Sequence, residues 1–325
     1  MAVRVKRLHN EEDENDILAA RKSCDTDDPV DFLVYDPVAI RLTHLFVRAG
    51  WSAGAVTLLS LVFGVCGGIL FYPRNTWINL LGIVFVIVAA ILDCSDGQVA
   101  RLTHTESQFG RFLDGTVDVI NFLVIYLSLG ARMTGENIPF TNVRWSGWIW
   151  LVVFGAMLAH ADQARMADFY RGMHLCFFKG MSACDLARSK DIREELDALP
   201  AESPLRERIY RNIYLTYTKA QEKKSPSSQR LLDEIEKNGG QPSEVLASAY
   251  VMRSRKYIQL TNVLTFNVRA YTLFVLLLFR LHFFYFPFVI IIMEGIKHYM
   301  IAKYEEIADD MLAEFFPGDR DRKSV

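Results

Sequence analysis

Residues 93–118 read DCSDGQVARLTHTESQFGRFLDGTVD and hold four aspartates in two pairs. Asp93 and Asp96 are three residues apart, and Asp114 and Asp118 are four apart, so each pair lies on one face of a helix. Strongly apolar sequence flanks the run on both sides. Carboxylates at a membrane edge are costly to desolvate, so their presence there indicates a functional site. Two such helices side by side would direct four carboxylates into one pocket, which suits a hard divalent cation.

Small and basic residues fill the rest of this run. Gly97 and Gly110 remove side chains where a ligand must approach the backbone closely, and Ala100 keeps a third position small. Arg101 offers a forked cation that fits phosphate oxygens. The run therefore indicates phosphate chemistry beside a metal site.

Apolar residues make up 51% of the chain and are concentrated in blocks. A hydrocarbon core of about 30 Å takes roughly 20 apolar residues in a helix. Six blocks are long enough, near 50–72, 77–95, 112–131, 146–164, 260–281 and 283–302. The sequence therefore predicts an all-α integral membrane protein with six transmembrane helices.

Basic residues are distributed unequally between the segments that join these blocks. The expected external loops hold only Arg74, Arg132, Arg144 and Arg280. The positive-inside rule then predicts that both termini and the aspartate loop lie in the cytoplasm. We expect the protein in the inner cell membrane with its active site on the cytoplasmic side.

The chain is expected to divide into a polar N-terminal arm (1–35), a membrane domain (36–303) and a charged C-terminal tail (304–325). Residues 180–257 form a polar insertion with helical patterning, and Gly239 with Gly240 is expected to stop a helix there. Acidic residues are interleaved with basic ones and no binding motif accompanies them. This pattern favours a solvated helical hairpin and argues against nucleic acid as a partner.

A short amphipathic helix is predicted just before the first apolar block. Pro37 stands at its N-terminus, and apolar positions recur at near-helical spacing through DPVAIRLTHLFVRAG, residues 36–50. Basic side chains lie between them, which favours a helix on the cytoplasmic membrane surface. An ordinary helix that packs on a partner is the alternative.

The fourth apolar block runs without a breaker into HADQARMADFYRGMH. Arg165 and Asp168 are three residues apart, as are Asp168 and Arg171, which fits a salt-bridge ladder on a solvated helix end. In the other interpretation, His160 and Arg165 face the aspartate pocket and bind polar groups of a substrate. Arg269, in the fifth block, is expected to face a polar cavity or to extend toward the membrane surface.

Five cysteines show no C-x-x-C spacing and are predicted to be free thiols. They are Cys24, Cys66, Cys94, Cys176 and Cys184.

The spacing D-x2-D-G-x2-A-R-x8-G-x3-D-x3-D resembles the signature of the CDP-alcohol phosphotransferase family, and the chain matches it without a gap. The resemblance implies an enzyme that transfers a phospho-lipid group from a CDP-linked lipid, such as CDP-diacylglycerol, to an alcohol and releases CMP. It implies that Asp93, Asp96 and Asp114 hold Mg²⁺ or Mn²⁺, as two ions or one. Asp118 would activate the acceptor hydroxyl or serve as a fourth metal ligand. The family also tends to form homodimers through its membrane helices.

The same resemblance implies residues that bind the CDP-linked donor. Gly97, Ala100 and Gly110 would leave room for cytidine, and Arg101 would hold a phosphate. Family members often carry Pro-Asn followed by Val-Thr at the start of the first membrane helix. Here the stretch reads SAGAVT and ends at Thr57, so the threonine is kept and the asparagine is missing.

Two further runs, TYTKAQEKKSPSSQR and KYIQLTNVLTFNVRA, are similar to a bacterial subgroup associated with inositol phospholipid synthesis. This similarity implies inositol phosphate or inositol as the acceptor; glycerol 3-phosphate, serine and a ceramide-type donor lipid stay open. Candidate acceptor-binding residues are Arg111, His160, Arg165, Arg171 and Arg269.

An ion-coupled transporter is the rival class, because such proteins also place carboxylates and basic partners in the membrane. A transporter is expected to show internal repeats or interrupted helices. We find neither in the sequence, and the carboxylates cluster in one run.

Overall fold

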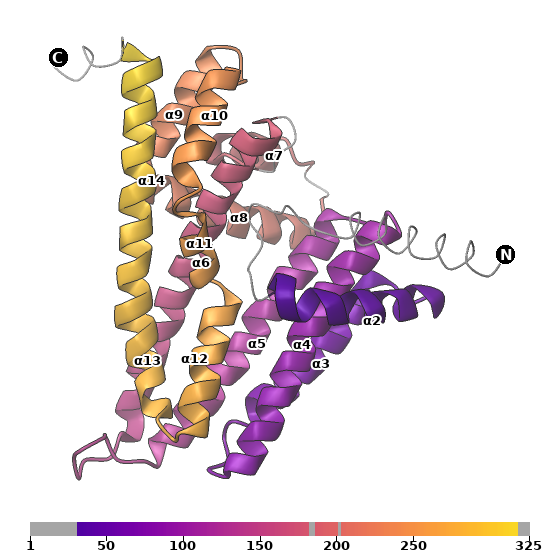
Figure 1. Ribbon diagram of the computed structural model, residues 1–325, viewed down its shortest axis with the longest axis vertical. Coiled ribbons are helices and arrows are strands. Elements are labelled where there is room, and N and C mark those ends of the chain that lie inside the picture. The colour runs from indigo at the N-terminus through magenta and orange to yellow at the C-terminus, as the bar shows by residue number, and fades with distance from the viewer. Residues whose placement is uncertain (1–30, 182–185, 201–202, 318–325) are drawn as a thin grey trace. The chain divides into compact units, whose positions relative to one another are not determined.

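The computed structural model describes residues 31–181, 186–200 and 203–317 (Figure 1). All regular structure in these ranges is helical. The all-α fold class is therefore confirmed.

The chain forms two compact units. The first consists of Met1–Leu158 and Ala270–Phe288, and the second of Ala159–Arg269 and Val289–Val325. Each unit is described by itself below, although the helices α6 and α12 run from one into the other.

The first unit contains the helices that carry the apolar blocks and the aspartate run. They are a π-helical turn (Asp31–Tyr35), α2 (Asp36–Arg48), α3 (Ala53–Ile69), α4 (Thr76–Leu102), α5 (Gln108–Thr134), the start of α6 (Ile149–Lys179), most of α12 (Phe266–Leu278) and α13 (Tyr285–Pro287).

Side-chain caps start helix α3 and helix α4, which carries Asp93 and Asp96. Ser52 Oγ accepts a hydrogen bond from Ala55 N at the start of α3, at 3.3 Å. Asn75 Oδ1 accepts from the amide nitrogens of Trp77 and Ile78 at the start of α4. Such oxygens satisfy amide groups that have no partner within the helix, and so fix where each helix begins.

Helices α3 and α4 lie close together because small residues face each other. A Cβ atom built on Gly82 would lie 2.9 Å from the carbonyl oxygen of Gly67 and 2.9 Å from a ring carbon of Phe71. On the other side, a Cβ on Gly67 would lie 2.8 Å from Val86. Only glycine at both positions lets the two backbones approach this closely, as is common between membrane helices.

Three helical stretches are long and apolar enough to cross a membrane, among the described residues. They are Thr76–Leu102, Leu113–Thr134 and His282–Phe315, and Ala53–Ile69 and Phe266–Leu278 are shorter apolar helices. The protein is therefore a helical membrane protein. The number of six spans and the orientation stay predictions.

Helix α2 begins at Asp36, with Pro37 in its first turn as expected. Small and polar side chains, Ala39 and Thr43, make its buried face. Thr43 Oγ1 donates a hydrogen bond of 3.0 Å to Gln98 Oε1 on α4. The helix therefore packs on α4 while large apolar side chains such as Leu45 stay exposed. Its position on the membrane surface stays a prediction.

A compact ionic cluster forms around Glu136, just after α5 ends. Its carboxylate lies 2.7 Å from His282 Nε2, 3.2 Å from Arg74 Nε and 3.5 Å from Arg132 Nε. Arg132 also donates to Asn79 Oδ1 at 2.8 Å. Burial acts to raise the pKa of Glu136, but the hydrogen bond with His282 and the charges of His282 and both arginines outweigh it, so this pKa lies below its ordinary value.

The second unit is built on the rest of α6. Its other helices are α7 (Ser189–Asp197), α8 (Leu205–Lys224), α9 (Pro226–Lys237), α10 (Glu244–Ser254), α11 (Ile258–Val263) and α14 (Glu294–Phe315), which follows a π-helical segment (Phe288–Met293). The polar insertion, expected to be a hairpin, thus forms the four helices α7 to α10. Gly239 and Gly240 end α9 with φ angles of +106° and +76°, as the sequence predicted.

Glu305 on α14 anchors the N-terminus of α9. Its carboxylate accepts hydrogen bonds from Ser227 N at 2.6 Å, from Ser228 Oγ at 2.6 Å and from Tyr170 OH at 3.1 Å. A carboxylate at this end of a helix is stabilised by the free amide groups and the helix dipole. Helix α14 continues to Phe315, into the segment expected to be a charged tail.

The prediction of free thiols is wrong for Cys176, which is disulfide-bonded. Cys66 and Cys94 are free. Cys24 and Cys184 lie outside the described residues.

Candidate active site

Helices α4 and α5 bring the two halves of the aspartate run together. Asp93 and Asp96 lie near the end of α4, and Asp114 lies in the second turn of α5. Ser107 starts α5 by accepting a hydrogen bond of 3.0 Å from Gly110 N. Because only five residues, 103–107, connect the two helices, the carboxylates of their adjoining ends meet.

The oxygens of Asp93, Asp96 and Asp114 come within 4.8 Å of one another. Asp96 is 6% exposed, and the other two are half-buried. Among the described residues, no hydrogen-bond donor reaches the buried Oδ1 of Asp93. Carboxylates this close repel one another unless a shared proton or a cation compensates their charge, and carboxylate oxygens are what Mg²⁺ and Mn²⁺ prefer. The three side chains therefore fit a divalent metal ion.

Asp118 lies one turn after Asp114 on α5 and is exposed. It is not one of the three carboxylates that meet within 4.8 Å. Its expected roles, as the group that activates the acceptor or as a fourth ligand, stay predictions.

The guanidinium of Arg101 folds back over Gly97 on α4. A Cβ atom on Gly97 would lie 3.3 Å from Arg101 Nη1, so the glycine leaves this space to the arginine. Ala100 is half-buried, and the Thr57 hydroxyl donates to Ala53 O of its own helix at 3.0 Å. Arg101 thus lies beside the face of α4 that carries the aspartates. The Thr57 hydroxyl, by contrast, is hydrogen-bonded within α3.

Sequence reasoning missed the polar contacts that fix α4 from behind. Gln98, two residues after Asp96, donates from Nε2 to Asp36 Oδ1 at 3.1 Å and accepts from Thr43. Ser95 donates to Ala39 O of α2 at 3.4 Å and to Ile91 O. A buried Gln and Ser inside an apolar helix were the available signal, since buried polar groups require partners.

The acceptor-binding candidates other than Arg111 belong to the second unit. Arg171 donates to Asn262 Oδ1 at 2.7 Å, and the fully buried Arg269 donates to Gln163 Oε1 at 2.7 Å. His160 is half-buried. The side chain of Arg111 lies outside the described ones. That these residues bind the acceptor stays a prediction.

Of the salt-bridge ladder expected along α6, the charge interaction between Asp168 and Arg171 is present, whereas Arg165 pairs with Asp162. Arg165 Nη2 lies 3.8 Å from Asp162 Oδ1, and the carboxylate of Asp168 accepts a hydrogen bond from Tyr217 OH at 3.2 Å. Arg165 lies over the ring of Tyr217, 5.7 Å from its centre. Helix α8 of the insertion therefore contacts the residues that the sequence singled out on α6.

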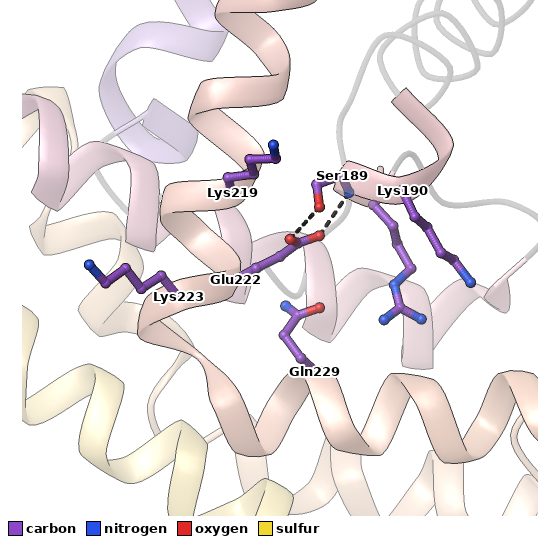
Figure 2. A pocket seen from close by; sticks show the side chains of 7 residues that line it. Ser189, Lys190, Lys219, Glu222, Lys223 and Gln229 are labelled. Carbon is purple, nitrogen blue, oxygen red and sulfur yellow. Dashed lines mark hydrogen bonds between the residues drawn. The ribbon is translucent and has the colours of Figure 1, made fainter. Parts of the chain in front are cut away.

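A pocket of about 430 Å³ lies between α7, α8 and α9 (Figure 2). Figure 2 shows Glu222 reaching Ser189 at the start of α7, where it accepts from Ser189 N at 2.7 Å and from its hydroxyl at 2.5 Å. Arg188 pairs with Asp233 and Glu236. The carboxylate of Glu222 thus already occupies the N-terminus of α7, where an anion would otherwise bind. We therefore interpret this pocket as structural.

Residues 51–167 match the family model described as CDP-alcohol phosphatidyltransferase. The match contains the whole aspartate run and ends inside α6. This stretch of the chain is therefore similar to CDP-alcohol phosphatidyltransferases, in agreement with the resemblance drawn from the motif. The insertion helices α7 to α10 lie outside this match.

Individual relatives are similar over shorter stretches. A phosphatidylinositol phosphate synthase of Streptomyces avermitilis is 35% identical over 72 residues, which are 22% of this chain and 29% of that protein. An archaetidylinositol phosphate synthase of Pyrococcus horikoshii is 31% identical over 78 residues, 24% of this chain and 40% of that protein. An uncharacterized protein of Aquifex aeolicus is 28% identical over 98 residues, 30% of this chain and 48% of that protein. The chain thus spans less than half the length of each of these relatives.

Proposed function

We propose that this protein transfers a phosphatidyl or similar phospho-lipid group from a CDP-linked lipid to an alcohol and releases CMP. The observation that carries the proposal is the cluster of Asp93, Asp96 and Asp114 within 4.8 Å, inside the matched domain. Inositol phosphate or inositol is the acceptor we propose, because two relatives are named as inositol phosphate lipid synthases. The active site would face the cytoplasm of a cell with the protein in its inner membrane, and the protein would act as a homodimer.

Different residues of the site would bind the metal, the phosphate and the nucleotide while the diphosphate is cleaved. Asp93, Asp96 and Asp114 would hold Mg²⁺ or Mn²⁺, as one or two ions, which when bound neutralise charge on the transferred and leaving phosphates. Arg101, placed beside Gly97, would bind a phosphate oxygen of the donor. Gly97, Ala100 and Gly110 would leave room for the nucleotide. Thr57, at the start of α3, would also contribute to binding the donor.

Asp118 would orient the acceptor hydroxyl and take its proton as the new P–O bond forms. An aspartate carboxylate offers two acceptor oxygens, which suits a hydrogen bond from the hydroxyl that reacts. The exposed position of Asp118 on α5 supports this role, because a soluble acceptor must reach it. Arg111, His160, Arg165, Arg171 and Arg269 would bind the acceptor's polar groups.

The test is CMP release by the purified protein with CDP-diacylglycerol and Mg²⁺. Inositol phosphate, inositol, glycerol 3-phosphate and serine are compared in parallel, with a second series that uses a CDP-linked ceramide-type lipid. We expect CMP with inositol phosphate or inositol and none when a chelator removes the metal. Release with glycerol 3-phosphate or serine alone would correct the acceptor. No release with any combination, from folded protein, would overturn the proposal.

A further inference from the structure

The ends of α4 and α5 that lie far from the aspartates carry a second group of charged residues. Three segments of the first unit meet there, residues 70–77, 131–148 and 278–284. Together they contain four arginines and one histidine, but Glu136 is their only carboxylate. Positive charge is therefore in excess at this end of the unit.

The carboxylate of Glu136 is compensated from inside the protein. Arg132 lies beside it, is only 5% exposed and also donates to the carbonyl oxygen of Phe71 at 3.1 Å. Arg74 contacts the same carboxylate through Nε, but its side chain is 59% exposed. Arg280 is exposed as well. One negative charge thus serves three arginines, and the two that a ligand can reach are Arg74 and Arg280.

Arg280 occupies a backbone position at which glycine is usual. It follows α12 in a Schellman motif, where Arg280 N donates to Leu277 O at 3.1 Å. In the same motif, Leu281 N donates to Leu276 O at 2.7 Å. The φ angle of Arg280 is +58°, which is unfavourable for a residue with a side chain. Strain of this kind is common at functional sites, and here it places a guanidinium on the surface, 3.3 Å from the hydroxyl of Thr76.

Exposed aromatic residues are neighbours of this contact in the chain. Trp77, next to Thr76, is 80% exposed, and Phe279, next to Arg280, is 72% exposed. Aromatic rings gather at the level of the lipid headgroups in membrane proteins. From Thr76 to Asp96, α4 rises by about 30 Å, which is the thickness of a hydrocarbon core. The two arginines are therefore expected at headgroup level, on the membrane face opposite the aspartate cluster.

We infer that Arg74 and Arg280 bind the phosphate of an anionic phospholipid in the leaflet opposite the aspartate cluster. Two guanidinium groups suit the oxygens of a phosphodiester. A zwitterionic lipid is disfavoured, because its ammonium group would add positive charge where positive charge is already in excess. Trp77 and Phe279 would contact the lipid beside its phosphate. The lipid is a ligand of the membrane domain and not a substrate, so this inference does not depend on the proposed function.

Lipid binding is measured by native mass spectrometry on the full-length protein in a neutral detergent. The titrants are phosphatidylglycerol and phosphatidylcholine, and a parallel series with phosphatidylglycerol contains inorganic phosphate as a competitor. We expect phosphatidylglycerol to bind about tenfold more tightly than phosphatidylcholine and inorganic phosphate not to displace it. Arg74→Gln should weaken phosphatidylglycerol binding about tenfold, as for one charge-assisted hydrogen bond.

The matched control is Arg144→Gln. Arg144 is an exposed arginine in the same three segments, and its side chain makes no ion pair with Glu136 in the part of the chain that the structure describes. This variant removes the same charge from the same end of the unit. We expect it to leave phosphatidylglycerol binding within about twofold.

Arg280→Gly separates lipid binding from folding, because glycine adopts a φ of +58° without strain. We expect this variant to bind phosphatidylglycerol about tenfold more weakly, while its melting temperature in lipid-free detergent is equal to that of the wild type or higher. A residue that served only the fold would show the opposite pattern, a lower melting temperature with unchanged binding.

Four results would overturn the inference. They are wild-type binding of phosphatidylglycerol by Arg280→Gly, a loss of its binding that occurs together with a lower melting temperature, an equal loss in Arg144→Gln, and displacement of the lipid by inorganic phosphate. The third would indicate diffuse attraction to positive charge, and the fourth a site for a soluble anion. The proposed function is tested separately by CMP release, which none of these measurements uses.

Discussion

At the scale of single residues, the three clustered aspartates differ in how far water reaches them. Asp96 is nearly buried, while Asp93 and Asp114 are half-buried. A buried carboxylate retains its charge only beside a cation, so the three residues are expected to act as one unit. If the cluster holds a metal ion as proposed, substitution of any one of them is therefore expected to weaken its binding.

We expect Asp96→Asn and Asp114→Asn each to lower the rate of CMP release about 1,000-fold, or about 4 kcal/mol of transition-state stabilisation. Asparagine keeps the shape of the side chain, so folding should be intact. The control is Glu106→Gln, which neutralises an exposed carboxylate in the loop between α4 and α5. Normal activity of either aspartate variant at normal expression would contradict the metal cluster.

The contribution of Glu136 to the stability of the fold is expected to depend on pH. Because folding lowers its pKa from 4.5, its contribution to stability is fully present above that value and is lost as the pH falls through the lower pKa of the folded state. We expect Glu136→Gln to unfold more easily at pH 7, by about 2 kcal/mol for a hydrogen bond to a charged partner. Melting curves of the variant and the wild type should converge at acid pH. Parallel pH profiles of the two proteins would rule out the effect.

At the scale of helices, the contact between α3 and α4 depends on the absence of side chains. We expect Gly82→Ala to destabilise the protein by about 1–3 kcal/mol, because the new methyl group would meet the Gly67 carbonyl oxygen at 2.9 Å. The matched control is Gly155→Ala on α6, where nothing lies within 4 Å of the added carbon. That variant should be neutral or slightly more stable, since alanine favours helices. Melting temperatures in detergent compare the two, and equal values would contradict the close approach.

Short sequence patterns predicted several helix ends and the aspartate cluster. Pro37 marked the start of α2, Gly239 with Gly240 marked the end of α9, and the spacing of Asp93, Asp96 and Asp114 with a short loop was enough to predict their cluster.

Contacts between distant segments could not be predicted in this way. Thr43 and Gln98 are 55 residues apart, and Asp168 and Tyr217 are 49 apart. A single sequence carries the periodicity of each helix but not the pairing of one helix face with another. For this reason the insertion was expected to be a solvated hairpin, although one face of α8 lies against α6.

At the scale of the whole molecule, the orientation in the membrane is open to direct measurement. In a protein with its native cysteines replaced, we expect Thr141→Cys to react with an impermeant thiol reagent in intact cells. Asn238→Cys should react only after the membrane is broken, because basic residues concentrate on its side. Both positions are exposed, so access is decided by the membrane. The reverse labelling pattern would invert the predicted topology.

Helix α14 carries several residues that contact other helices of the second unit. It holds Lys297 against Asp162 near its start and Glu305 against the N-terminus of α9 further along. Each residue of an α-helix advances the rotation by about 100°, so adding or deleting one residue between them would turn Glu305 away from Ser227 and Ser228. The length of α14 between the two contacts is consequently fixed, because seven inserted residues would restore the direction of Glu305 but would displace it by about 10 Å along the helix axis.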